Sequence, residues 1–272
     1  TVVTQGDLFF VGGYGSGFLL EWDPTRDWIP TDKDNPESNP FWHRICTPIL
    51  HRPHDLLAHP DGKTIVMAGT PGYGSTGGGL LIWDRESSTG ELLEHTDLLP
   101  DHSTMSLVAL SGGKLLGGTT TEAGTGGEKK AEVAELYQMD LSTKVIDWRE
   151  AVLQGGQSYT DLCVGESGLV YGFVDRARFF VFDPNEKRVI QEMDSEKAYG
   201  LTAFQQGPRV FVVAPRGEIY ILFERGIGLL DEGSFEIDLV AESPVEISNG
   251  GDVLEGRLYF TSTSGLYSWE LP

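Results

Sequence analysis

An all-β fold of about six four-stranded antiparallel units is what this sequence predicts, and three observations support it. A phrase of apolar residues closing in an acidic residue recurs six times between Trp22-Asp23 and Trp269-Glu270. The 35 glycines and 14 prolines supply frequent turns. No run of apolar residues approaches the length that spans a bilayer. A repeat of this kind, in which each unit is a small sheet, predicts a single β-propeller.

The six closing phrases share an apolar or aromatic strand followed by an acidic residue at a turn. They occupy residues 19–23, 81–84, 136–140, 180–183, 228–231 and 266–270. Apolar and aromatic side chains suit a half-buried strand, and the acid can accept hydrogen bonds from the amides of the turn. Asp23-Pro24 and Asp183-Pro184 predict type I turns, because proline presets φ at the second turn position.

Each closing phrase is preceded by a strand, a glycine-containing turn and a second strand, as in residues 55–68 and 161–171. Each unit is therefore expected to be a four-stranded meander. The expected blades of the single domain 1–272 cover residues 1–48, 49–100, 101–155, 156–197, 198–245 and 246–272. Residues 128–136 have the only helix-like spacing, but they lie between two strands of one unit, so we expect a loop excursion.

The last unit holds strands near residues 251–254, 258–261 and 266–271 and then stops one strand short. The first unit begins at Thr1, within what should be its innermost strand. Either the propeller closes imperfectly, or residues upstream of Thr1 supply the missing outer strand. The lack of an initiator methionine and of a signal peptide suggests a processed mature form or a fragment, and we expect a longer precursor or a larger assembly.

The repeat resembles that of bacterial β-propellers of the WD40-like and Kelch-like kind, including those of exported glycan-processing proteins and some polysaccharide lyases. Trp22-Asp23 and Trp83-Asp84 stand where WD repeats place their dipeptide. The resemblance covers the whole chain and implies a fold and a secreted or periplasmic location, but not a reaction.

Charge and cysteine content exclude several classes of partner. The formal charge of −21, from 41 acidic and 20 basic residues, repels phosphate backbones and anionic lipid surfaces. We therefore expect no nucleic-acid partner and no membrane insertion. Cys46 and Cys163 lie far apart without a C-x-x-C pair, so neither a disulfide framework nor a zinc site is indicated. No histidine or carboxylate spacing demands a metal, and we expect no cofactor.

One face of the propeller should carry the functional loops. The resemblance implies that connections between blades and hairpins between second and third strands lie on the same face. Residues 11–17 and 69–79 are equivalent hairpins that each present Tyr-Gly-Ser, at Tyr14 and Tyr73. Residues 72–77 match G-x-G-x-x-G, but a dinucleotide site needs a following helix where we expect a strand. The glycines serve either a flexible hairpin or close approach of a ligand to the backbone.

Polar residues recur where the chain enters the first strand of each unit. Alignment without gaps places His51, His102 and Gln157 in one column and His54, Met105 and Thr160 in another. The candidate ligand-binding residues from these loops and entries are Tyr14, His51, Arg52, His54, Tyr73, His102, Tyr159, Arg176 and Tyr199. The histidines suit hydrogen bonding between blades, ligand contact or acid–base work, or metal binding.

The long connection over residues 23–48 carries Trp28, Phe41 and Trp42. Aromatic faces of this sort stack on sugars or pack under a long loop, and we expect packing.

Two functions follow from these candidates. The first is a non-catalytic binding or assembly module of an exported bacterial protein, which contacts a glycan or a protein partner through the loop face. The second is a lyase-like or hydrolytic enzyme that acts on a glycan. Its acid and base would come from His51, His102, Tyr73 and Tyr159, and Arg52 or Arg176 would neutralise a uronate carboxylate.

Overall fold

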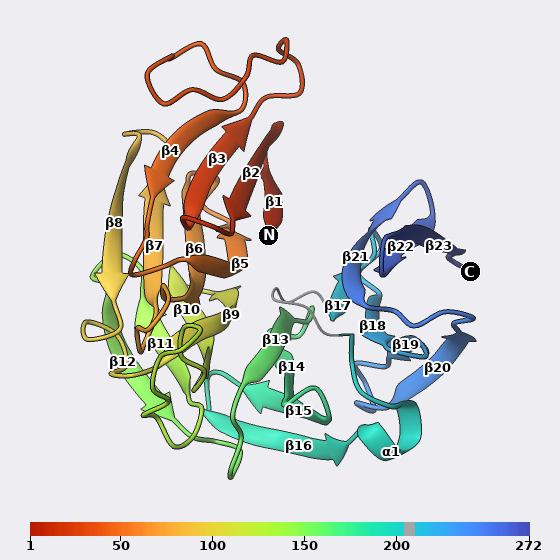
Figure 1. Cartoon of the computed structure of the whole chain (residues 1–272). Helices are drawn as coiled ribbons and strands as arrows, with labels where there is room; N and C mark the ends of the chain where they lie inside the picture. Colours follow the sequence, from red (N-terminus) through yellow and green to blue (C-terminus); the bar gives the residue numbers. More distant parts are fainter. Residues whose placement is uncertain (204–209) are drawn as a thin grey trace. The chain divides into compact units, whose positions relative to one another are not determined.

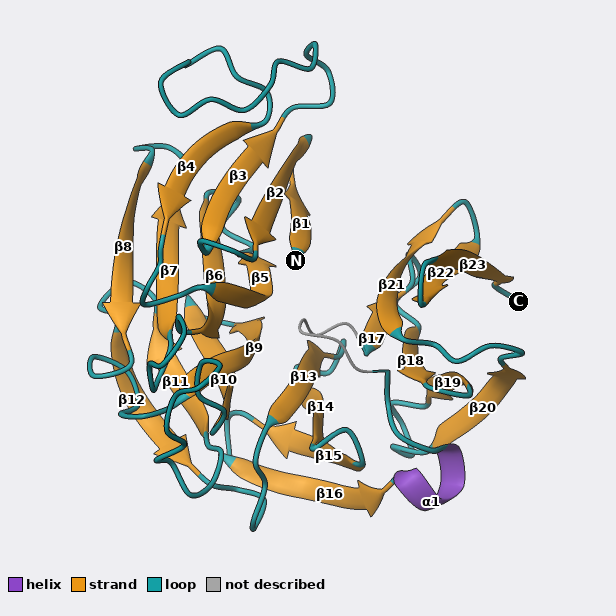
Figure 2. Ribbon diagram, viewed as in Figure 1, coloured by secondary structure: helices purple, strands orange, loops and turns teal. Residues whose placement is uncertain are grey.

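The computed structural model describes residues 1–203 and 210–272, and β-strands dominate this part of the chain (Figures 1 and 2). Within these residues, 23 strands form six antiparallel sheets, and the one helix, α1, covers Glu196–Tyr199. Residues 121–135 connect two strands without a helix, as expected. No helix in the described ranges is long and apolar enough to cross a membrane.

Two compact units divide the chain, Thr1–Glu150 (unit 1) and Ala151–Pro272 (unit 2). Unit 1 holds three four-stranded meanders, blades 1 to 3. Their strands are β1 (Val2–Gln5), β2 (Leu8–Gly13), β3 (Phe18–Trp22) and β4 (Phe41–Ile45); β5 (Arg52–Ala58), β6 (Thr64–Thr70), β7 (Gly79–Asp84) and β8 (Thr89–Glu94); and β9 (Ser103–Leu110), β10 (Lys114–Thr120), β11 (Leu136–Asp140) and β12 (Val145–Glu150).

Unit 2 holds blades 4 to 6, of which the last has three strands among the described residues. The strands are β13 (Tyr159–Val164), β14 (Val170–Val174), β15 (Arg178–Asp183) and β16 (Arg188–Asp194); β17 (Phe211–Val213), β18 (Ile219–Phe223), β19 (Gly226–Leu230) and β20 (Ile237–Glu242); and β21 (Asn249–Leu254), β22 (Arg257–Ser262) and β23 (Gly265–Glu270). The predicted fold class, an all-β propeller of six blades with a last blade one strand short, is confirmed.

The hydrophobic core lies between neighbouring blades within each unit. Phe10 and Leu19 of blade 1 pack against Leu56 and Leu81 of blade 2, and comparable clusters join the remaining neighbours in each unit. In blade 2, which has a neighbouring blade on each side, β6 is consequently covered on both faces, and all seven of its residues are buried. A strand buried on both faces reads as a continuous apolar run instead of an alternating pattern.

In five of the six blades, the acidic residue that closes the repeat caps a turn after the third strand. Asp84 accepts hydrogen bonds from the amides of Glu86 and Ser87 at 2.8 and 3.1 Å. The corresponding Asp23, Asp140, Asp183 and Asp231 do the same in their own turns. The predicted role of the acid is therefore confirmed in five blades. In the sixth, Glu270 instead pairs with Arg257 at 3.1 Å.

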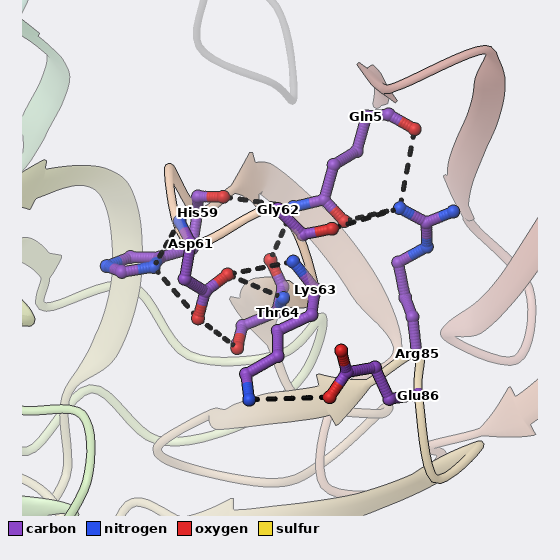
Figure 3. Close-up of polar contacts among 8 residues, drawn as sticks. All are labelled: Gln5, His59, Asp61, Gly62, Lys63, Thr64, Arg85 and Glu86. Carbon is purple, nitrogen blue, oxygen red and sulfur yellow. Dashed lines mark hydrogen bonds and ion pairs between the residues drawn. The ribbon is translucent and has the colours of Figure 1, made fainter.

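At the end of the blades that carries these acidic turns, side chains link blade 1 to blade 2 (Figure 3). Gln5 is buried, and its Nε2 donates to the carbonyls of His59 and Thr64 at 3.0 and 3.2 Å. Arg85 Nη1 donates to Gln5 Oε1 at 2.9 Å and to the Gly62 carbonyl at 3.3 Å. We call Gln5, Arg85 and the carbonyls that they contact the interblade latch. It joins the β1–β2 turn to two turns of blade 2.

Candidate functional site

Four of the predicted site residues meet at the opposite end of the blades in unit 1. Tyr14 lies in the β2–β3 turn, Tyr73 lies in the β6–β7 hairpin, and His51 and Arg52 lie where the β4–β5 connection enters blade 2. Successive strands of a meander run in opposite directions, so these connections share one end of the blades. We call Tyr14, His51, Arg52 and Tyr73 the tyrosine–arginine platform.

The guanidinium group of Arg52 holds the two tyrosines together. Its central carbon lies 5.0 Å from the centroid of the Tyr14 ring and 5.5 Å from that of Tyr73, within cation–π range. The two tyrosine hydroxyls are hydrogen bonded to each other. Tyr14 and Tyr73 nevertheless remain 55% and 61% exposed. Large aromatic surface is thus fixed in place and left open to solvent.

His51 packs edge-on against both tyrosines from the neighbouring strand entry. Its ring centroid lies 5.4 Å from that of Tyr14 and 5.6 Å from that of Tyr73, at interplanar angles of 84° and 67°. Its Nδ1 is 3.0 Å from Thr47 Oγ1, and its amide donates to the Thr70 carbonyl at 2.9 Å. These contacts fix the orientation of the imidazole beside the two rings.

The β10–β11 connection of blade 3 supports the platform from the other side. Arg52 Nη2 donates to Thr125 Oγ1 at 2.7 Å, and the Gly74 amide donates to the Thr125 carbonyl at 3.0 Å. Gly124 lies so close to the β6–β7 hairpin that a Cβ there would stand 2.1 Å from the Gly72 carbonyl oxygen. As a connection between the second and third strands of a blade, it belongs to the loop face expected from the sequence, but Thr125 was not singled out.

Electrostatics within the platform favour a charged arginine and a polarised phenol. The hydrogen bond with Tyr14 and then the contact with Arg52 lower the pKa of Tyr73 below its usual value. Burial alone lowers the pKa of Arg52, but the hydroxyls of Tyr73 and Tyr14 outweigh it, and the net shift is upward. The platform therefore offers two aromatic faces, phenolic hydroxyls and one permanent positive charge.

His54 and His102 lie in unit 1 but make other contacts. His54 is 7% exposed, and its Nε2 is 3.1 Å from Thr70 Oγ1. The two ring nitrogens of His102 each lie 2.9 Å from a backbone carbonyl, those of Pro100 and Val133. These hydrogen bonds join His54 to its own blade 2 and His102 to the chain around blade 3, whereas the expected structural role was hydrogen bonding between blades.

The predicted column of His54, Met105 and Thr160 has a structural meaning that the sequence did not reveal. Each of the three is the extra residue of a β-bulge in the first strand of its blade, because the pairing register shifts across it. All three side chains are buried. A bulge re-aims the side chain that it carries, so this column consists of buried bulge residues instead of side chains exposed on the loop face.

The remaining candidates lie in unit 2, where their side chains are buried or contact other residues of the unit. Tyr159 is fully buried, with its ring 5.7 Å from that of Phe180. Arg176 Nε and Nη2 donate to the Thr202 carbonyl at 3.1 and 2.7 Å, and Arg176 forms an ion pair with Glu224.

Tyr199 stacks on Phe223 and donates its hydroxyl to the Ile237 carbonyl at 2.7 Å. Burial and then the nearby Asp238 raise its pKa. The hydroxyl and one ring face of Tyr199 are therefore occupied by contacts within unit 2.

The aromatic residues of segment 23–48 behave in two ways, and two of them, Phe41 and Trp42, lie in β4 itself. Trp42 packs with its ring 5.3 Å from that of Phe18, as expected. For Trp28 the expected packing is wrong, because the side chain is 66% exposed. Trp28 stands at the opposite end of β3 from Tyr14 and is no part of the platform.

Comparison with known proteins identifies a fold but no family. No protein-family model matches the chain, and no curated protein does. Two solved structures of an extracellular domain from B. thetaiotaomicron are similar, one described as part of a one component system and the other as part of a hybrid two component system. Each matches this chain with a TM-score of 0.67 and 10% sequence identity. The match covers 99% of this chain but only 34% of the length of the similar chain. At this identity the similarity shows the fold alone.

Proposed function

We propose that this chain is a non-catalytic, glycan-binding propeller of an exported bacterial protein, and that the tyrosine–arginine platform is its contact surface. The observation that carries the proposal is the pair of largely exposed tyrosines fixed by Arg52. Tyrosine combines an apolar face with a polar tip and is for that reason enriched at binding interfaces. The extracellular setting of the similar domains is in keeping with export.

The charge distribution favours a neutral glycan over an acidic one. The protein carries a net charge of −21, which repels a polyanion over long range. Arg52 is the cation of the platform, and its guanidinium is already engaged by the two rings and by Thr125. Sugar rings offer CH faces for the tyrosine rings and hydroxyls for the phenols. A neutral oligosaccharide thus satisfies both features without a second charge.

A binding experiment with matched variants tests the proposal. The protein is screened against xylo-, cello-, manno- and malto-oligosaccharides, with oligogalacturonate as the acidic counterpart, and hits are quantified by calorimetry. We expect Tyr73→Ala to weaken binding about tenfold or more, because one stacking face and one hydroxyl are lost, and tenfold corresponds to about 1.4 kcal/mol. Trp28→Ala, which removes an exposed aromatic at the other end of blade 1, should bind like the wild type.

Other results would redirect the assignment. Failure of every neutral oligosaccharide to bind would refute it and leave a protein partner as the next candidate. Release of unsaturated products from oligogalacturonate would show the lyase-like activity instead.

A further inference from the structure

A small hollow adjoins the tyrosine–arginine platform in unit 1. It has a volume of about 220 Å³, and its walls include Pro48, Ile49, Pro71, Thr76, Glu94 and His95. Two of the segments that line it also carry the platform, since Pro48 and Ile49 precede His51, and Pro71 and Thr76 flank Tyr73. A ligand on the platform is therefore within reach of the hollow.

His95, one of the residues that line the hollow, carries a fixed donor. Its Nδ1 accepts a hydrogen bond from the Asp101 amide at 2.8 Å, so the neutral imidazole carries its proton on Nε2. No hydrogen bond to that nitrogen is formed within residues 1–203 and 210–272. Gly77 makes room for the ring, because a Cβ there would lie 2.2 Å from His95 Cγ. The hairpin that bears Tyr73 is thus shaped around this imidazole.

Glu94 and Thr76 supply acceptors beside that donor. The Glu94 side chain is exposed, and its carboxylate has no ion pair or hydrogen bond to any residue that the structure describes. Thr76 Oγ1 donates to the Glu128 carbonyl at 2.6 Å, which leaves its lone pairs as acceptors. Pro48, Ile49 and Pro71 form apolar walls around these groups.

We propose that this hollow is a second subsite, which takes one neutral sugar ring of the glycan bound at the platform. The proposal rests on the proposed glycan-binding function. It adds a second contact point and a preference for neutral over acidic sugars. The volume equals that of about seven waters in the liquid and is below the range of about 300–1,000 Å³ typical of drug-sized ligands, so it admits one ring. The carboxylate of Glu94 accepts from sugar hydroxyls and repels a uronate.

The subsite makes affinity depend on ligand length. A monosaccharide occupies either the platform or the hollow, whereas an oligosaccharide that spans both gains the second contact without a second loss of translational freedom. We expect affinity to rise over the first few sugar units and then level off.

The test uses the neutral oligosaccharide series that binds best, in lengths from one to six units. Glu94→Gln keeps the shape but weakens a hydrogen bond to a charged acceptor, and His95→Gln removes the imidazole donor. Each should lower the affinity of the longer ligands about tenfold and leave that of the monosaccharide nearly unchanged. Glu86→Gln, which neutralises an exposed carboxylate at the opposite end of blade 2, is the matched control.

The outcomes separate this inference from the proposed function. If Tyr73→Ala abolishes binding while both hollow variants keep the affinity of every length, the second subsite is wrong and the platform stands. If wild-type affinity is the same for one sugar unit as for six, the subsite is also refuted. If no neutral oligosaccharide binds at all, the glycan-binding function itself fails.

Discussion

The interblade latch predicts a measurable loss of stability when Gln5 is replaced. Its Nε2 makes two hydrogen bonds to buried carbonyls, and its Oε1 accepts one from Arg85. A neutral hydrogen bond contributes about 1 kcal/mol and one to a charged group about 1.5–3 kcal/mol. Since Arg85 retains the Gly62 carbonyl as an acceptor, we expect Gln5→Met to lower the free energy of unfolding by about 3 kcal/mol.

Gln5→Met is the informative variant because it preserves side-chain volume and removes only the polar contacts. Urea unfolding followed by tryptophan fluorescence gives the free energy of unfolding, and amide hydrogen exchange shows whether β1 opens first. Gln154→Ala, at an exposed glutamine, should change stability by no more than about 0.5 kcal/mol. A loss of that size or smaller for Gln5→Met would refute the reasoning, because the three contacts would then contribute nothing net.

Three further predictions concern the turns, the loops and the thiols. The Ser142 hydroxyl and turn amides lower the pKa of Asp140 in the folded protein. The stabilisation that the ionised Asp140 gives to the fold is therefore complete above the unfolded pKa of about 3.9 and is lost as pH falls through the lower folded pKa. Urea midpoints measured from pH 7 to 3 should decline less steeply for Asp140→Asn than for the wild type. Gly124→Ala should disrupt the contact with the Gly72 carbonyl and weaken ligand binding about tenfold with little change in the urea midpoint; unchanged calorimetric affinity would contradict this. Burial raises the pKa of the Cys46 and Cys163 thiols to about 11 and about 12, so disulfide-exchange reagents should label them at pH 8 only as the protein unfolds, and rapid labelling of the native protein would contradict this.

The sequence predicts features whose partners are local. In five blades the acidic residue of the closing phrase contacts amides two or three residues away, so its role at Asp84 or Asp183 follows from the turn alone. The strands follow from apolar runs bounded by glycine and proline. The missing strand of the last blade follows from counting those runs.

Contacts between residues far apart in the sequence could not be predicted from local sequence patterns. Gln5 and Thr125 are an isolated amide and an isolated hydroxyl in the sequence, and their partners lie 54 to 80 and 73 residues away. The column containing His54 was found, but its position at a one-residue bulge, where the side chain is buried, was not. No local pattern marks such a bulge, since it depends on the register of the paired strand.

The interblade latch also imposes an order of events during synthesis. The residues that complete it are separated by 80 positions, from Gln5 to Arg85. At about 5–20 residues per second, the ribosome delivers Arg85 roughly 4 to 16 seconds after Gln5. The buried amide of Gln5 therefore has no final partner while blade 1 emerges, and β1 can settle only after most of blade 2 has left the ribosome. β1 is thus made before blade 2 but becomes fixed only after the turns of blade 2 that contact Gln5 have been made.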